Sequence, residues 1–402
     1  MKYKIILNSH FFCSTSGGTD LFIKILNNIL NNNKHEIFIV VAKNNFLSIL
    51  KKIFFPFKEF LKQIIYLEKI KFKYWPWQIG SDEIYNFLIK KNKKNFKIID
   101  ADYLNIKKEI KIINPDIIFP CTNPIPEFKE KNIGYIFDLQ HEFFKKHFNK
   151  KDIKIRRKNI IKVLNYSKII IVNSKHTIKT LSQKYKNYLT QKKIYSIPFH
   201  PNIPNNFFNW NLNLKKKYQI NNKYFMICNQ FWKHKNHNFA IKAFIKYCSL
   251  GGNYDLIMSG ETNDKRFPEY FSEIKSIIYN GNCDGRIKIL GLIKKSHQIS
   301  LLRNAQALIQ PTLFEGGPGG GACNEAIALG VPVLASNIPV NLEIKSKIIK
   351  FFNPFKLNEL SKLLLKTEKN KKLFQNLNLK SKSIKQNKSL YLFYEKIFNK
   401  MY

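Results

Sequence analysis

The sequence has little arginine. Only five of its 69 basic residues are arginine, and with 27 acidic residues the formal net charge is +42. Base recognition and bidentate phosphate binding favour arginine, whereas the lysines here are spread along all 402 residues among asparagine and isoleucine. Drift in an AT-rich genome accounts for such a composition, and attraction to an anionic membrane or glycolipid is the alternative. We therefore predict that the chain does not bind nucleic acid.

The chain also lacks paired cysteines and long apolar runs. Its six cysteines lie far apart and form no Cys-x-x-Cys pair, which is typical of free thiols in a reducing compartment. Met1 to Leu7 is too short and too charged for a signal peptide. No apolar run approaches the ~18–20 residues of a membrane-spanning helix. We expect a cytoplasmic protein whose membrane contact, at the inner face of the plasma membrane, is peripheral.

The signatures of several enzyme classes are absent. The sequence has no G-x-G-x-x-G nicotinamide fingerprint, no Walker sequence, no nucleophile elbow and no Asp-x-Asp suited to a donor-bound metal. His234 and His237 are three residues apart, as metal ligands can be, but no third ligand is nearby. We therefore expect no cofactor and no metal.

Short apolar runs alternate with amphipathic stretches in both halves of the chain, which predicts parallel sheets. The pattern breaks between Ile197 and Asn209, where prolines and asparagines gather, and we place the interdomain linker there. The expected fold is α/β, with two Rossmann-like domains whose parallel sheets face an interdomain cleft. We expect strands at 3–7, 36–41, 116–120, 134–137, 168–172, 224–228, 254–259, 286–290, 307–310 and 331–335, and helices from Lys175, at 238–247 and at 323–329.

One segment has two interpretations. Between Ile49 and Phe72 several phenylalanines and other apolar residues are mixed with six lysines, and Pro56 interrupts the pattern. A basic, aromatic surface that rests on a membrane has this composition. Two ordinary helices whose apolar side packs in the core also have it, and this second interpretation is slightly favoured.

The most informative motif is a cluster of five glycines, Phe314 to Gly321, directly before a predicted helix. Glycine lets a backbone approach a ligand closely, and the start of a helix offers free N–H groups to phosphate. Glu315 and Glu325 flank this loop, and carboxylates pair well with sugar or ribose hydroxyls. A purely structural turn is the alternative, although it needs fewer glycines.

Three further motifs also follow predicted strands, where ligands of parallel sheets bind. Residues 228–237 hold Lys233 and Lys235, which are candidates to neutralise a diphosphate, with a solvated surface charge as the alternative for each. Asp138 and His141 pair an acid with an imidazole that can act as a general base or an orienting donor, or can form a satisfied structural pair. Gly17 and Gly18 precede the first predicted helix, and alone are a weak signal.

In this order the motifs resemble the group 1 (family four) glycosyltransferases of GT-B fold. The resembling segments are the Gly-Gly after the first strand, Asp-Leu-Gln-His-Glu-Phe, Asn-Gln-Phe-Trp-x-His-Lys-Asn-His, and Phe-Glu-Gly-Gly-Pro-Gly-Gly before Glu-Ala. The resemblance implies an N-terminal acceptor-binding domain (1–200), a C-terminal nucleotide-sugar-binding domain (201–385), and a last helix (386–402) that crosses back to the first domain. It also implies retention of anomeric configuration without a bound metal.

The resemblance assigns roles to individual residues. Lys235 steadies the donor diphosphate, Glu315 lies beside the transferred sugar and Glu325 lies at the ribose. His141 matches a histidine on the acceptor side, with Asp138 in its motif. The glycines that would lie along the donor or near its phosphates are Gly17, Gly18, Gly316, Gly317 and Gly319.

The chain departs from the family pattern at two places. Nine residues separate Glu315 from Glu325, where the family normally has seven, and the longer loop weakens the ribose role of Glu325. An arginine often stands five residues before the lysine, but Gln230 is there in this chain, so phosphate binding rests on Lys235 alone or borrows Lys233.

The expected function is transfer of a hexose-type sugar from a nucleotide-diphosphate sugar to a glycan or lipid-linked acceptor, in lipopolysaccharide or surface polysaccharide biosynthesis. A nucleotide-sugar epimerase of the same architecture is one alternative. A non-catalytic basic module that binds membranes or nucleic acid is another, and the glycine loop between two acids speaks against it.

Overall fold

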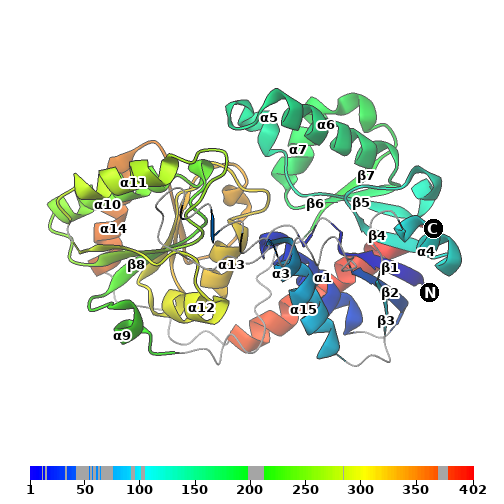
Figure 1. Ribbon diagram of the computed structural model, residues 1–402, viewed down its shortest axis with the longest axis horizontal. Helices are drawn as coiled ribbons and strands as arrows, with labels where there is room; N and C mark the ends of the chain where they lie inside the picture. Colours follow the sequence, from blue (N-terminus) through cyan, green and yellow to red (C-terminus); the bar gives the residue numbers. More distant parts are fainter. Residues whose placement is uncertain are drawn as a thin grey trace.

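The fold was analysed in a computed structural model of the full chain. It describes residues 1–10, 12–13, 16–31, 34–41, 54, 57, 60–61, 64, 76–91, 96–100, 105–197, 212–283, 285–369 and 379–402. Two α/β domains lie side by side, and α5, α6 and α7 stand above the junction in the view of Figure 1.

The N-terminal domain is built on a seven-stranded parallel sheet of order β3-β2-β1-β4-β5-β6-β7. Its elements are β1 (Lys4–Asn8), α1 (Ser16–Leu30), β2 (Glu36–Val41), α3 (Pro76–Ile89), β3 (Phe96–Asp100), α4 (Ile106–Ile113), β4 (Ile117–Cys121), η2 (Pro126–Lys131), β5 (Asn132–Ile136), α5 (Gln140–Phe143), η3 (Lys145–His147), α6 (Lys150–Asn165), β6 (Ile169–Val172), α7 (Lys175–Lys184), η4 (Lys186–Tyr188) and β7 (Lys193–Ser196). Ser174 caps α7, because its hydroxyl accepts a hydrogen bond from the Thr177 amide at 3.0 Å.

The C-terminal domain holds a six-stranded parallel sheet of order β10-β9-β8-β11-β12-β13. Its elements are α9 (Lys215–Tyr218), β8 (Tyr224–Cys228), η5 (Lys233–Lys235), α10 (His237–Ser249), β9 (Asp255–Ser259), α11 (Tyr270–Tyr279), β10 (Ile287–Ile289), α12 (Lys295–Asn304), β11 (Ala307–Gln310), α13 (Gly320–Ala328), β12 (Val333–Ser336), η6 (Asn341–Glu343), β13 (Ile349–Phe352) and α14 (Leu357–Lys369). In both sheets the strand order reverses beside the first strand, and such switch points bind ligands at the carboxyl ends of the strands.

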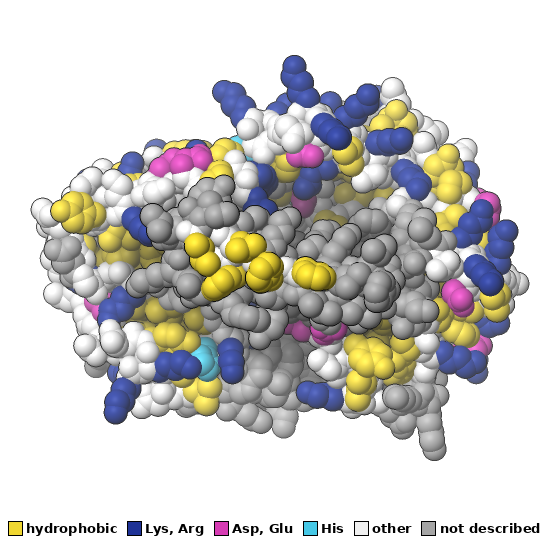
Figure 2. All heavy atoms as spheres, viewed as in Figure 1, with side chains coloured by type: hydrophobic (Ala, Val, Ile, Leu, Met, Phe, Trp, Pro, Cys, Tyr) yellow, Lys and Arg dark blue, Asp and Glu magenta, His cyan; other side chains and the backbone are white. Residues whose placement is uncertain are grey.

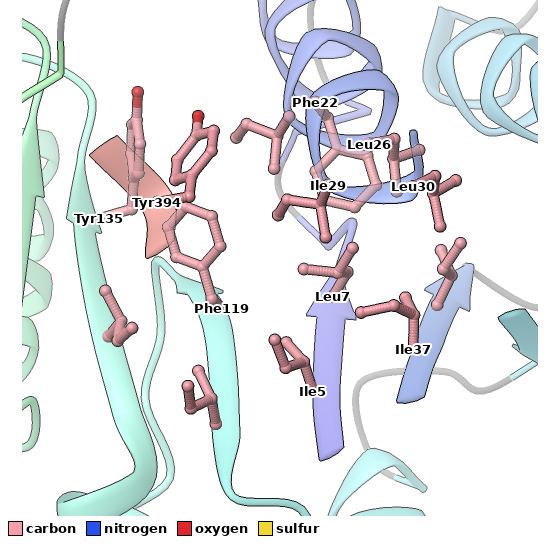
Figure 3. Close-up of a cluster of buried hydrophobic side chains, with 14 of the residues drawn as sticks. Ile5, Leu7, Phe22, Leu26, Ile29, Leu30, Ile37, Phe119, Tyr135 and Tyr394 are labelled. Carbon is pink, nitrogen blue, oxygen red and sulfur yellow. The ribbon is translucent and has the colours of Figure 1, made fainter. Parts of the chain in front are cut away.

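The last helix, α15 (Leu379–Asn399), packs into the core of the N-terminal domain. Its buried side chains recur at helical spacing, so that one face meets the sheet. Figure 3 shows Tyr394 above Phe119 and beside Tyr135, while Phe22 and Leu26 of α1 cover Leu7. The first domain is therefore completed by the far end of the chain.

The structure places a strand in each of the ten predicted positions, to within about two residues at each end, and confirms the α/β fold with two parallel sheets. The predicted linker, Ile197 to Asn209, lies outside the described residues apart from Ile197. No helix in the described part of the chain is long and apolar enough to cross a membrane.

Most of the segment from Ile49 to Phe72 also lies outside the described residues. Its five described members are helical apolar residues, and all are between 40% and 60% exposed: Phe54, Phe57, Phe60, Leu61 and Ile64. The favoured interpretation, with the apolar side packed in the core, is therefore wrong for these residues. Hydrophobic side chains lie open at the middle of the face shown in Figure 2.

Candidate functional site

The glycine loop leads from β11 into α13 at the junction between the domains. Gly319 and Gly320 have φ angles of 68° and 63°, which favour glycine over residues with a Cβ atom. Asn324 holds the loop from inside the helix, because its amide donates to the oxygens of Pro318 at 3.1 Å and Gly320 at 2.7 Å. No side chain in the described part of the chain caps α13, and no acid occupies its first turn. The N–H of Gly320 donates to the oxygen of Gly317 at 3.2 Å, and the N–H groups that follow it in the first turn can bind an anion.

Lys235 and Glu315 form an ion pair beneath this loop. The Nζ atom of Lys235 lies 2.5 Å from Oε1 of Glu315, and both side chains are almost buried. Gln310 at the end of β11 donates to the same oxygen at 2.9 Å, and Asn229 after β8 donates to Gln310 at 2.7 Å. The two residues that were predicted from separate motifs therefore meet, and the strand ends fix their positions.

Glu325 lies on α13 and pairs with a residue that the sequence did not suggest. The Nζ atom of Lys295, at the start of α12, is 2.6 Å from Oε1 of Glu325. The second carboxylate oxygen, Oε2, is buried and has no hydrogen-bond partner among the described residues. Such an atom is costly to leave unpaired, and it is free to accept a hydrogen bond from a ligand hydroxyl.

The start of α1 faces this part of the C-terminal domain. Gly17 and Gly18 lie in its first turn, and nothing approaches within 4 Å of the position that a Cβ atom on Gly17 would take. One turn later in α1, Asp20 remains in contact with solvent, but the surrounding protein removes part of the water from its carboxylate. This desolvation raises the pKa of Asp20. Lys295 and Glu325 both act on Asp20 electrostatically, so α1 is close to the second domain.

Asp138 reaches the glycine loop from the other side. A Cβ atom on Gly316 would lie 2.7 Å from the backbone oxygen of Phe137 and 3.2 Å from the Cβ atom of Asp138. The carboxylate of Asp138 accepts a hydrogen bond from the amide of Gln140 at 2.9 Å, which starts α5. Glycine is thus required where the glycine loop touches the N-terminal domain, and the predicted acid lies at that contact.

His141 is buried in a polar network that α5, α6 and α7 form together. Its Nε2 atom is 3.3 Å from Oε1 of Glu142 and 3.4 Å from the hydroxyl of Tyr185. Glu142 is fixed by two hydrogen bonds from Arg157, at 2.8 and 2.7 Å, and one from Tyr185 at 2.8 Å. The Nδ1 atom of His141 is buried without a hydrogen-bond partner among the described residues.

The pKa values in this network follow from burial and charge. Burial lowers the pKa of His141 although Glu142 raises it, so the imidazole is neutral at pH 7. The hydrogen bonds from Arg157 lower the pKa of Glu142 to about 2. A charged Glu142 therefore holds the proton of His141 on Nε2, and Nδ1 is left as a base or acceptor.

Lys233 and Gln230 do not join the Lys235–Glu315 pair. The Nζ atom of Lys233 lies 4.7 Å from the ring centre of Phe267. Gln230 follows β8, and a Cβ atom on Gly260 would approach its Cα atom to 2.9 Å. The structure instead brings Arg266 to the domain junction, where its Nη1 atom donates to Oε1 of Gln140 at 3.4 Å. Nothing in the local sequence around Arg266 signals this position.

The surroundings of the two histidines beside Lys235, His234 and His237, indicate a structural role. The ring of His237 stacks on Phe231 with 4.2 Å between ring centres, and burial lowers its pKa to about 3. Burial also lowers the pKa of His234 well below its usual value. Among the described residues, no group of three or more histidine, cysteine or acidic side chains could hold a metal ion.

The arrangement can bind a phosphorylated ligand between two domains. The free N–H groups of α13 and the ammonium of Lys235 can neutralise negative charge, and the unpaired oxygen of Glu325 can accept from a hydroxyl. Asp138 approaches the loop from the opposite domain, and His141 lies three residues further along the chain in α5. A charge that develops during a reaction is stabilised best by hydrogen-bonding groups that are already in position before the ligand binds.

Comparisons with known proteins agree with this geometry. Residues 211–384 match the family model of the glycosyl transferases group 1. HepE from Anabaena in complex with UDP has a TM-score of 0.63 and 12% sequence identity over 98% of this chain and 99% of HepE. Sucrose-phosphate synthase from Thermosynechococcus elongatus has a TM-score of 0.59 and 12% identity, over 99% of this chain and 98% of the synthase.

A third similar structure is WaaG, a glycosyltransferase involved in lipopolysaccharide biosynthesis. It has a TM-score of 0.56 and 12% identity over 99% of both chains. No curated protein sequence matches the chain. At such low identity these structures establish the fold alone. The chain therefore has the GT-B fold, and its residues 211–384 match the family model of the group 1 glycosyl transferases.

Proposed function

We propose that the protein is a retaining, metal-independent glycosyltransferase that moves a hexose-type sugar from a nucleotide-diphosphate sugar to a glycan or glycolipid acceptor. Lipopolysaccharide or surface polysaccharide biosynthesis is the proposed setting, and it rests on the family resemblance and the fold shared with WaaG. The observation that carries the proposal is the buried Lys235–Glu315 pair beneath the uncapped N-terminus of α13.

In the proposed mechanism, Lys235 and the N–H groups of α13 bind the donor diphosphate and neutralise its charge as it leaves. Glu315, which Gln310 holds in place, stays beside the anomeric centre and offsets the positive charge that develops there. Glu325 accepts a hydrogen bond from the ribose through its free oxygen. Asp138 and His141 orient the acceptor hydroxyl from the opposite domain. The paired acids of the family support retention. NMR of the product tests this, because it determines the anomeric configuration of the transferred sugar.

Binding of the donor is tested by thermal unfolding with a panel of nucleoside diphosphates and their sugars, UDP first because HepE was solved with it. A ligand at ~100 times its dissociation constant adds ~2.7 kcal/mol, which raises the melting temperature. We expect one nucleotide to do so in the wild type and Lys235→Gln to abolish the effect. Lys235→Gln keeps a hydrogen-bond partner for buried Glu315, so the variant should fold.

The matched control is Lys242→Ala, because Lys242 is exposed on the adjacent α10 and has no part in the site. A shift that survives Lys235→Gln would contradict the assignment of the donor site. Conversion of the donor without any acceptor would instead indicate an epimerase.

We also propose peripheral contact with an anionic membrane at the inner face of the plasma membrane. Its support is the exposed apolar side chains of Phe54, Phe57, Phe60, Leu61 and Ile64, in a segment that also carries six lysines. We expect Phe54→Ser together with Phe57→Ser to weaken co-sedimentation with anionic phospholipid vesicles several-fold. Tyr279→Ser, at an exposed residue of α11, is the control. Equal sedimentation of all three proteins would contradict this contact.

A further inference from the structure

Four basic side chains gather where η3 and α6 meet the loops after β8 and β9. We call Arg156, Arg266, Lys233 and His147 the junction cluster. The guanidinium carbons of Arg156 and Arg266 lie 4.7 and 5.2 Å from the ring centre of Phe148. The ring centre of Phe267 lies 4.7 Å from Nζ of Lys233 and 4.9 Å from the ring centre of His147. Each domain therefore contributes two of the four groups.

The aromatic rings contact the three permanent cations, Arg156, Arg266 and Lys233, without neutralising them. A cation–π contact stabilises a charge modestly, but it adds no negative charge. The carboxylate that pairs with the cluster is Asp264, which lies 3.5 Å from Nε of Arg266. Its two oxygens also accept backbone amides, from Arg266 at 3.0 Å and Lys233 at 3.2 Å. The cluster thus has more cations than its nearby acid can balance.

Arg266 keeps hydrogen-bonding capacity for a ligand. Its Nε atom faces Asp264 and its Nη1 atom donates to Gln140 at 3.4 Å, whereas Nη2 has no hydrogen-bond partner among the described residues. Lys233 and Arg156 make ring contacts, and their charged ends form no ion pair with the described residues. The positive charges of Arg266 and Lys233 disfavour a further charge on His147. They lower the pKa of His147, which burial already lowers.

The choice of side chain adds to the argument. Arginine is rare in this chain, with five among 69 basic residues, yet one arginine from each domain contacts the ring of Phe148. Arginine stacks on aromatic rings and binds oxyanions in a bidentate manner, which lysine does not do. An oxyanion that bridges the two domains would use both properties.

We propose that the junction cluster is a second oxyanion site, which binds a phosphate or carboxylate group of the acceptor and rests on the transferase function proposed above. Gln140, which receives the Arg266 hydrogen bond, lies between Asp138 and His141 in sequence, so the site borders the acceptor side of the cleft. The acceptor would then be an acidic glycan or a phosphorylated glycolipid. Because both domains supply ligands, binding of the acceptor anion also favours the closed arrangement of the domains.

The test uses inorganic phosphate as the probe, measured by isothermal titration calorimetry. All proteins carry Lys235→Gln, so that the donor site contributes little to phosphate binding. We expect Arg266→Gln and Arg156→Gln each to weaken phosphate binding about tenfold, as loss of one charge-assisted contact would. Arg266→Lys should recover part of the affinity because it restores the charge. Lys265→Gln is the matched control, since Lys265 is exposed in the same loop and loses the same charge.

The outcomes separate this proposal from the donor site. Equal phosphate affinity in Arg266→Gln, Arg156→Gln and Lys265→Gln would overturn the second site, whatever the nucleotide experiment gives. Conversely, wild-type protein that no nucleotide stabilises would overturn the proposed function while phosphate binding can still depend on Arg266. Vesicles of phosphatidylglycerol and phosphatidylcholine identify the source of the anion. Weaker sedimentation of Arg266→Gln supports a lipid phosphate, and unchanged sedimentation with lost phosphate binding supports a phosphate on the glycan.

Discussion

At the scale of single residues, the sequence identified side chains but could not identify their partners. His141 stood out because an imidazole follows a predicted strand, and Lys235 and Glu315 stood out by their motifs. Glu142 follows His141 directly in the sequence, but Arg157 of α6 and Tyr185 after α7, which fix Glu142, are brought there only by folding. Lys295 and Arg266 were missed for the same reason, since a lone basic residue is not informative in a chain with 69 of them.

The His141 network predicts a pH effect. Glu142→Gln keeps an oxygen that can accept from Nε2 but removes the charge that raises the pKa of His141, so the pKa should fall further. If neutral His141 serves the acceptor, protonation of its ring limits activity at low pH. The acidic limb of kcat/KM against pH should then move to lower pH, whereas a purely structural defect would lower the whole profile.

The control for this change is Glu127→Gln, because Glu127 is an exposed acid on η2 that pairs with Lys107 on the surface. Its profile should match the wild type. An acidic limb that stays in place in Glu142→Gln would mean that His141 does not titrate in the reaction.

At the scale of elements, prediction depended on where a strand lies in its sheet. Central strands such as β6 are continuous apolar runs that are buried on both faces, and the sequence shows them directly. The three strands that were not predicted are β3, β7 and β13, and all three are edge strands that contain a lysine. The fourth edge strand, β10, also contains a lysine but was predicted. Lysine at a sheet edge discourages pairing with another chain, and it also removes the apolar signal.

The loops after the strands were predicted well because glycine and polar residues mark them in the sequence. The five apolar residues of 54–64 were predicted less well, since the same helical spacing fits a core face and an exposed face. Local sequence gives the period of a helix, but its neighbours decide which face is covered. The glycine loop is less ambiguous, because a close approach at Gly316 and positive φ angles at Gly319 and Gly320 limit these three positions to glycine.

At the scale of the whole molecule, hydrogen bonds connect the glycine loop to the opposite domain. The amide of Gly319 donates to Oδ1 of Asn341 at 3.0 Å, and Asn341 begins the short helix η6 that ends at Glu343. The carboxylate of Glu343 then accepts from the backbone amides of Lys175 at 2.9 Å and His176 at 2.6 Å, at the start of α7. An acid of one domain thus caps a helix of the other.

This contact predicts that Glu343 helps to hold the domains together. A carboxylate at the start of a helix stabilises it by about 0.5–2 kcal/mol, and here that energy also favours the closed arrangement. We expect Glu343→Ala to raise the radius of gyration in small-angle X-ray scattering without loss of secondary structure, and the nucleotide that binds best to reverse part of the change. Glu359→Ala is the matched control, because Glu359 accepts from the amide of Asn353 at 2.8 Å within the C-terminal domain alone. Identical scattering of wild type and Glu343→Ala would show that the aromatic contacts of Phe143 and Phe314 suffice to keep the domains in place.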